Sequence, residues 1–145
     1  MGDIAKDINS TFPSEHVKAL INIKYTANWI EGKSNHVLKP FKISVQQYNI
    51  LRILRGAKEK VTVQTVKDRM IEKSPNTTRL MDKLCAKNLI KRVRCENDRR
   101  VVYVQIADLG LKMLRDIKMD GVGETMNKLT EEEAEQLNFL LDKIR

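Results

Sequence analysis

The sequence predicts a mainly helical chain with one small antiparallel β-hairpin. Apolar residues recur every three or four positions along most of the chain, which is the period of a helix with one buried face. Only between residues 90 and 106 does the pattern become extended and rich in β-branched side chains. The 145 residues contain no linker rich in proline or glycine, so we expect a single domain over residues 1–145.

The first helix is expected from about Ser14, a candidate N-cap, to Gly32. It carries an apolar stripe at helical spacing and further apolar residues beside that stripe, so more than one side of the helix is apolar. We expect such a helix to pack against its own domain and against a partner. The stripe consists of Val17, Leu20, Ile23, Ala27 and Ile30, and the residues beside it are Ile21, Tyr25 and Trp29.

Three helices are predicted in the middle of the chain. Ser44 and Gln47 have the spacing of a capping box and begin the second helix. A short third helix follows Thr62. Ser74 and Pro75 fit the N-cap and the first residue of the fourth helix. The inward residues of these helices are expected to be Tyr48, Leu51 and Leu54, then Val63, Val66 and Met70, then Thr77, Leu80, Met81 and Leu84.

The fourth helix is predicted to end near Asn88, because asparagine tolerates the left-handed conformation that often follows a helix. Residues 90–94 and 101–106 then form the hairpin, with a charged tip between them. A fifth helix begins near Asp108, although two later glycines weaken its second half. The capping box of Thr130 and Glu133 begins the last helix, with the apolar stripe Leu137, Leu140, Leu141 and Ile144.

Positive charge is concentrated in the middle of the sequence. The net charge of the whole chain is +8; it is +4 over residues 41–60, +6 over residues 61–106 and −3 over residues 107–145. Such a concentration is typical of a protein that binds the phosphates of nucleic acid. A lysine-rich surface without such a partner is the alternative interpretation of the charge.

Two helices joined by a short turn and followed by a hairpin indicate a winged helix-turn-helix. In this arrangement the second helix of the pair enters the major groove of DNA with its N-terminal residues first. Arg79 is the best candidate for contacting a base, because a guanidinium group can donate two hydrogen bonds to guanine. The expected DNA contacts of this helix and the adjoining strand are Ser74, Pro75, Asn76, Thr78, Arg79, Lys83 and Arg94.

The tip of the hairpin supplies the remaining expected contacts. Arg99 and Arg100 suit insertion into a minor groove, whose negative potential attracts arginine. Asp98 is expected to pair with the guanidinium group of Arg100 and so to hold the shape of the loop. The alternative interpretation of the tip is an ordinary polar turn. The alternative interpretation of Arg79 is a surface residue of the helix without a role in binding.

Three segments together resemble the MarR family of multiple antibiotic resistance regulators. They are residues 74–84 (Ser-Pro-Asn-Thr-Thr-Arg-Leu-Met-Asp-Lys-Leu), residues 87–92 (Lys-Asn-Leu-Ile-Lys-Arg) and the Asp-Arg-Arg of residues 98–100. The helix order matches that family across nearly the whole chain. The sequence departs from it at Asn88, where glycine is usual, and at Ile106-Ala107, where Leu-Thr is usual.

The resemblance implies a homodimer that binds a palindromic operator in duplex DNA as a transcriptional regulator. Residues 44–106 would form the DNA-binding region, and residues 1–40 and 107–145 the dimerisation region. It also implies a repressor released by a small aromatic or anionic effector. Tyr25, Trp29, His36 and Tyr48 could line the effector pocket, and the alternative for the three aromatic residues is a place in the core.

Other classes of function have less support in the sequence. No metal-ligand, nucleophile or phosphate-loop motif is present, so we expect neither an enzyme nor a bound cofactor or metal. A winged-helix module for protein interaction remains the alternative function. Cys85 is expected in the core and Cys95 near the hairpin tip, with no redox role. The two cysteines and the lack of a signal or membrane segment predict a cytoplasmic protein.

Overall fold

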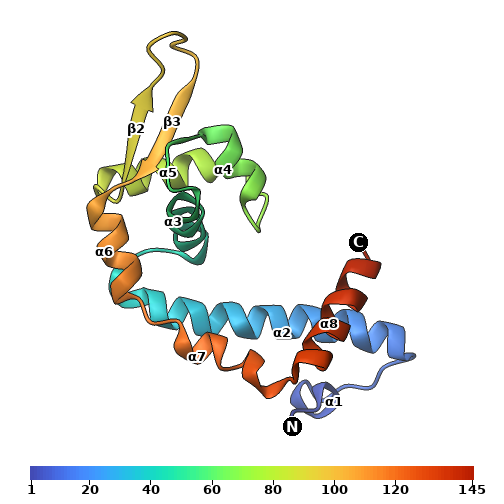
Figure 1. The fold of residues 1–145 in the computed structure, drawn as a ribbon. Coiled ribbons are helices and arrows are strands. Elements are labelled where there is room, and N and C mark those ends of the chain that lie inside the picture. The colour runs from blue at the N-terminus through green and yellow to red at the C-terminus, as the bar shows by residue number, and fades with distance from the viewer.

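The computed structural model describes residues 1–145 as a helical chain with a three-stranded antiparallel sheet (Figure 1). The predicted fold class is confirmed. The elements are α1 (Ile4–Asp7), α2 (Glu15–Leu38), η1 (Lys39–Phe41), α3 (Val45–Ala57), β1 (Val61–Thr62), α4 (Val63–Arg69), α5 (Thr77–Ala86), β2 (Ile90–Arg94), β3 (Val102–Ile106), α6 (Asp108–Asp116), α7 (Asp120–Gly123), η2 (Met126–Lys128) and α8 (Glu131–Lys143).

Helix α3 lies at the centre of the core. Its start is fixed by the predicted capping box, in which the Ser44 hydroxyl accepts from the backbone N–H of Gln47 and the Gln47 side chain accepts from the N–H of Ser44. The buried face of α3 packs with apolar residues of α4, α5, α6 and the sheet. The most buried residues of this cluster are Leu38, Ile50, Leu51, Leu54, Val66, Met81, Leu84, Leu89 and Val104.

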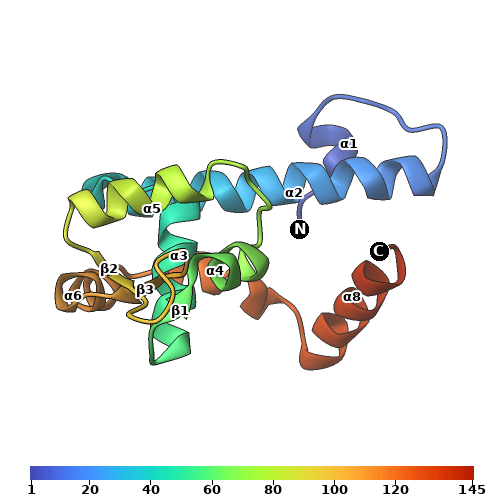
Figure 2. The ribbon, with the colours of Figure 1, turned by 90° about the horizontal axis from the view of Figure 1, so that it is seen from above.

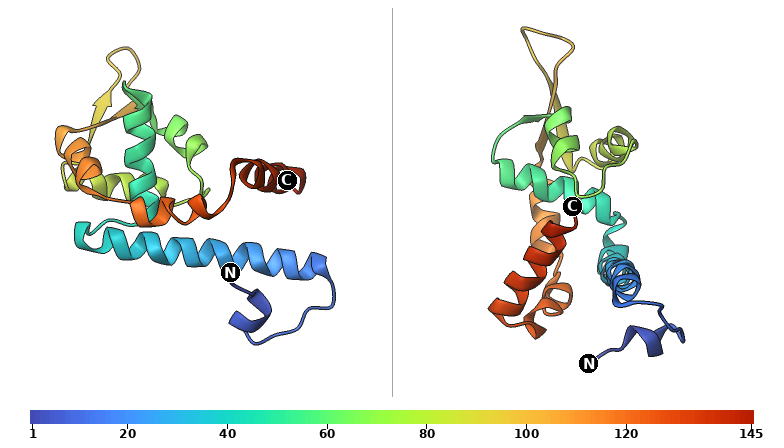
Figure 3. Two further views of the ribbon diagram at one scale, coloured as in Figure 1. Left: turned by 60° about the horizontal axis from the view of Figure 1, so that its bottom comes forward. Right: turned by 90° about the vertical axis from the view of Figure 1, so that its right-hand side faces the viewer.

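The sheet has the strand order β1-β3-β2, so the hairpin strand β3 lies in the middle. The register pairs Ile90 with Ile106 and Arg94 with Val102. Sequence reasoning missed strand β1, because its two residues are too few to show a period; they pair with Val104 and Tyr103 of β3. The hairpin projects beyond the helices and places its tip away from the core (Figures 1 and 3).

The start of α5 differs from the prediction. The helix begins at Thr77, and Ser74 and Pro75 lie in the turn before it. The Ser74 hydroxyl accepts from the N–H of Asn76, and the Ser74 carbonyl accepts from the buried hydroxyl of Thr77. These bonds satisfy the turn locally, so the serine stabilises the approach to the helix instead of capping it. The predicted end is confirmed, since Asn88 has φ 58°.

Helix α2 is longer than predicted. It continues through Gly32, where no side chain crowds the backbone, and ends only at Leu38. Burial of Ser34 and Leu38 explains the extension, because these residues pack against the lobe that contains α3. The predicted fifth helix is shorter: α6 ends at Asp116, and the segment with the two glycines forms only α7 and η2.

Helices α3 to α6 and the sheet form a compact lobe on one side of the C-terminal part of α2 (Figures 1 and 3). The N-terminal part of α2 extends beyond this lobe with α1 beside it. Helix α8 stands clear of α2 when the molecule is viewed from above and from the side (Figures 2 and 3). None of the helices combines the length and the apolar character needed to cross a membrane.

Candidate nucleic-acid interface

Helix α5 has one face in the core and one face in solvent. Thr77, Met81 and Leu84 are buried against the lobe. Asn76, which directly precedes the helix, and Arg79, in its first turn, are exposed. The other expected contacts of this segment, Pro75, Thr78 and Lys83, are also exposed, and Ser74 is half-buried. Most of the residues predicted to meet DNA therefore lie on the solvent side of the N-terminal end of α5, and Lys83 lies farther along the helix, in its last turn.

The hairpin tip carries the exposed residues Arg99 and Arg100, and Arg94 is exposed at the end of β2. The predicted ion pair of Asp98 with the Arg100 guanidinium group is wrong. Instead, Asp98 Oδ1 accepts from the backbone N–H of Arg100 at 2.9 Å. The Asp98 carbonyl accepts from the N–H of Val101 at 3.0 Å, which closes the turn. Asp98 therefore shapes the loop through the backbone and leaves both guanidinium groups free.

An ion pair joins α5, the predicted recognition helix, to the hairpin. Asp82 of α5 and Arg92 of β2 lie 2.6 Å apart, both partly exposed. Sequence analysis did not pair Asp82 with Arg92. The sequence showed only that the two residues have opposite charges, and several other arginines could have paired with Asp82 equally well. The pair adds a polar contact between the helix and the strand that leads to the tip.

Cys85 lies beside this ion pair on the inner side of α5. Burial raises the pKa of its thiol above the ordinary value, although the nearby Arg92 acts in the opposite direction. A thiol with a raised pKa is mostly protonated at neutral pH and is a poor nucleophile. The interpretation of Cys85 as a packing residue agrees with this environment. Cys95 is half-buried near the hairpin tip.

A hollow of about 520 Å³ lies between the start of α4, helix α5 and the base of the hairpin tip. Thr78 of α5, Arg92 of β2 and Arg100 of the tip are among its lining residues. A hydroxyl group and two guanidinium groups on one concave surface are donors suited to phosphate oxygens. Hydrogen-bond donors therefore line the surface from α5 to the hairpin tip.

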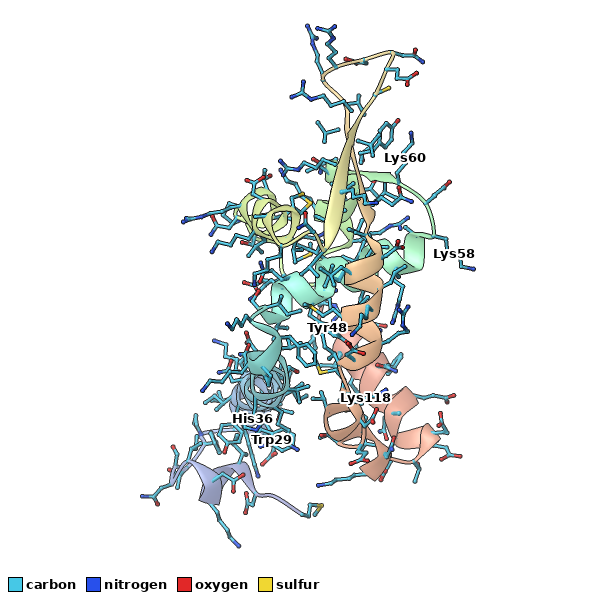
Figure 4. The ribbon with its side chains drawn as sticks, turned by 90° about the vertical axis from the view of Figure 1, so that its left-hand side faces the viewer. Trp29, His36, Tyr48, Lys58, Lys60 and Lys118 are labelled. Atoms are coloured by element: carbon cyan, nitrogen blue, oxygen red, sulfur yellow. The ribbon has the colours of Figure 1, made fainter.

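The four residues expected in an effector pocket do not lie together. Trp29 and His36 line a cavity of about 540 Å³ between α2 and α7, with Lys33 between them in sequence. The Lys33 ammonium lies 4.1 Å from the centroid of the Trp29 ring. Tyr48 belongs to α3 and packs against the core, and Tyr25 lies outside the lining of this cavity (Figure 4).

The fold and the α5–hairpin surface define a DNA-binding transcriptional regulator of the winged helix-turn-helix class. A family model described as transcriptional regulator SarA/Rot matches residues 33–117. The chain belongs to this family of MarR-like regulators. The match covers the whole lobe with the sheet, the recognition helix and the hairpin, and so includes every expected DNA contact.

Among curated relatives, the HTH-type transcriptional regulator MhqR of Bacillus subtilis (strain 168) is 33% identical over 85 residues. The aligned segment covers 57% of this chain and 59% of MhqR, so the similarity spans less than two thirds of that relative. This similarity supports the family and leaves the whole activity of this chain to be tested.

Two solved structures have the same fold. A MarR transcription factor from Planctomyces limnophilus is 31% identical, has a TM-score of 0.70, and is matched over 91% of this chain and 98% of that chain. A cysteine-to-serine mutant of MarR from E. coli, solved in complex with operator DNA, has a TM-score of 0.71 at 24% identity, over 99% of each chain. The second comparison concerns the fold alone.

The backbone role of Asp98 gives a prediction in which charge and structure disagree. Asp98→Ala should weaken DNA binding about 2- to 10-fold, because the turn loses a hydrogen bond worth about 0.5–1.5 kcal/mol. Asp98→Asn keeps the acceptor oxygen and removes the negative charge, so it should bind at least as tightly as the wild type. Fluorescence anisotropy with a labelled duplex measures both affinities, and Asp98→Ala, which loses the hydrogen bond, should melt at a slightly lower temperature than Asp98→Asn.

If both variants bind more tightly to the same extent, Asp98 acts only by repelling phosphate. A second measurement uses Arg100→Ala, which leaves the backbone N–H in place. Because Asp98 holds the loop that presents Arg100, the loss from Asp98→Ala should be smaller in the Arg100→Ala background than in the wild type. An equal loss in both backgrounds would mean that Asp98 acts independently of the presentation of Arg100.

Proposed function

We propose that this chain is a homodimeric repressor that binds a palindromic operator and is released by a small anionic aromatic effector. One observation carries the DNA contact: the exposed first turn of α5 and the arginine-tipped hairpin lie on the same lobe and are tied together by Asp82 and Arg92. The first turn suits a major groove, and the tip suits the adjacent minor groove. Acting on chromosomal DNA, such a regulator would work in the cytoplasm.

The division of the chain supports the same proposal. Residues 44–106 carry the basic surface and form the lobe together with α6, and the N-terminal part of α2 and helix α8 carry exposed apolar side chains. Helix α8 has no buried residue in the single chain, and the N-terminal part of α2 has none either. Exposed fractions on these helices are large for apolar side chains: 56% for Leu20, 48% for Leu140 and 68% for Ile144. A second copy of the chain is the proposed cover for these two helices.

The cavity between α2 and α7 is the proposed effector site. Its lining combines the Trp29 indole with the Lys33 ammonium group and the His36 imidazole. An indole face stacks on an aromatic ring, and the two nitrogen groups can donate to a carboxylate. The cavity lies where the proposed dimerisation helix α2 meets the segment that returns from the lobe. Occupation of this site would therefore act on the placement of the lobe.

The variant Arg79→Ala tests whether Arg79 contacts a base or a phosphate. Arg79→Ala should cost about 1–3 kcal/mol on the preferred sequence and relax the preference at one base position. Arg115→Ala removes the same charge from α6 and serves as the control, with affinity and preference close to those of the wild type. Selection from a random duplex library, followed by affinities on the selected sites, measures both effects.

If Arg79→Ala weakens every sequence equally, Arg79 is only a phosphate contact. If the wild type selects no sequence and its affinity for duplex DNA does not fall with salt, the protein-interaction module becomes the better interpretation.

Dimerisation should depend on the apolar stripe of α8. Leu140→Asp should shift the wild-type dimer to a monomer at micromolar concentration, because a carboxylate cannot be buried without a partner. Asn138→Asp adds the same charge two positions away, on the opposite side of the helix, and should leave the dimer intact. Sedimentation velocity measures the state. A monomeric wild type, or a dimer in both variants, would contradict the assignment.

The effector site can be tested with its own fluorophore, because Trp29 is the single tryptophan of the chain. Benzoate should quench Trp29 fluorescence and release DNA over the same concentration range, and the neutral isostere benzamide should do neither. Lys33→Gln should reduce the difference between the two compounds, and Lys24→Gln on the same helix should not. Equal binding of benzoate and benzamide would contradict an anion site.

A further inference from the structure

A second basic surface lies on the far side of the hairpin from α5. Lys58 and Lys60 follow the end of α3 and precede β1, and the hairpin stands between them and the recognition helix (Figures 2 and 4). Figure 4 shows Lys60 higher along the hairpin than α5, toward the side of the tip. Sequence reasoning noted the net charge of this region but placed every expected DNA contact between residues 74 and 100.

The Lys60 side chain is held by the sheet. Its ammonium group lies 5.0 Å from the centroid of the Tyr103 ring. Tyr103 pairs with Val93 and Thr62, while its neighbour Val104 is fully buried, so Tyr103 belongs to the sheet face turned away from the core. A cation over an aromatic ring is partly ordered before it meets a ligand. Lys60 is therefore aimed along the outer face of the hairpin.

Neither lysine is neutralised within the protein. The ion pairs of the structure join Arg92 with Asp82, Lys112 with Asp116, and Arg145 with Asp142, and none includes Lys58 or Lys60. Glu59 between them is exposed and unpaired as well. The two ammonium groups are therefore available to a partner with negative charge.

Lys58 also occupies a backbone position that favours glycine. Its φ is 60°, in the left-handed region, where it ends α3 with its N–H bonded to the carbonyl of Arg55. Glycine would adopt this conformation without steric cost. A lysine here bears that steric cost and holds an exposed positive charge at the C-terminal end of α3, where the charge also favours the helix dipole.

We propose that Lys58 and Lys60 bind phosphates of the DNA strand beyond the groove that the hairpin tip enters. This inference rests on the proposed contact of the tip with a minor groove. A minor groove is bounded by two phosphate backbones. With α5 in the major groove on one side of the tip, the outer face of the hairpin meets the backbone on the other side. The contact increases the length of DNA that the protein covers. It adds no base recognition, because lysine binds phosphate as a point charge.

The experiment compares two duplexes that contain the same selected site. The short duplex ends at the outermost position that the tip protects in a wild-type footprint, and the long duplex continues for about one helical turn on each side. The double variant Lys58→Gln/Lys60→Gln should match the wild type on the short duplex. On the long duplex its salt dependence should be shallower, by roughly 0.9 for each lost contact and roughly 3.6 for the four lysines of a dimer.

Two control variants isolate the effect. Lys6→Gln/Lys128→Gln removes the same charge from α1 and η2 and should behave as the wild type on both duplexes. Lys58→Gly removes one ammonium group while suiting the local backbone, so its melting temperature should not fall below that of the wild type. Its salt dependence on the long duplex should be reduced by half as much as in the double variant.

Equal affinities and salt dependences of the wild type on the two duplexes would overturn the inference. So would an equal loss for the lysine variant and the distant control, because the effect would then be one of net charge alone. Both results leave wild-type binding to the short duplex intact. Failure of the wild type to bind the short duplex would instead contradict the proposed DNA contact of α5 and the tip.

Discussion

The rest of the structure depends on the buried apolar face of α3. Ile50, Leu51 and Leu54 are almost completely excluded from solvent, and elements from both sides of the chain meet on them. Helix α5 and strand β3 each use one face to pack on this surface, so the opposite face of each is left to solvent in a fixed direction. Burying these side chains contributes about 1.5–3 kcal/mol each. The core thereby decides which residues of α5 can meet a partner.

Local chemistry was predictable from the sequence wherever a short segment satisfies its own backbone. The capping box of Ser44 and Gln47 and that of Thr130 and Glu133 are both present, because their partners lie three residues apart. The left-handed Asn88 was predictable because asparagine itself tolerates that conformation at the end of a helix. The change from a helical period to an extended, β-branched pattern located the hairpin, although only Ile90 of β2 and Val104 of β3 are buried. These features need no knowledge of the rest of the fold.

Tertiary relationships were not predictable, even where the residues themselves were singled out. Asp98 was expected to bind a side chain, but spacing alone cannot distinguish the Arg100 guanidinium group from its backbone N–H. The pairing of Asp82 with Arg92 depends on how α5 crosses the sheet. Four residues were grouped into one pocket because the family resemblance implies an effector site and these side chains could have lined it. Packing instead places Tyr48 in the core and leaves Trp29 and His36 together.

The ion pair between α5 and β2 has a consequence for regulation. Because the recognition helix and the hairpin share this contact and the same core, we expect them to move as one rigid body. A ligand held against α2 would then leave each lobe's choice of bases unaltered. It would change the separation and tilt of the two lobes across the dimer. In the proposed dimer, the effector would therefore change the spacing of operator half-sites that the protein can bind. An operator with a different spacing would then lose its release by the effector, or would be bound only when the effector is present.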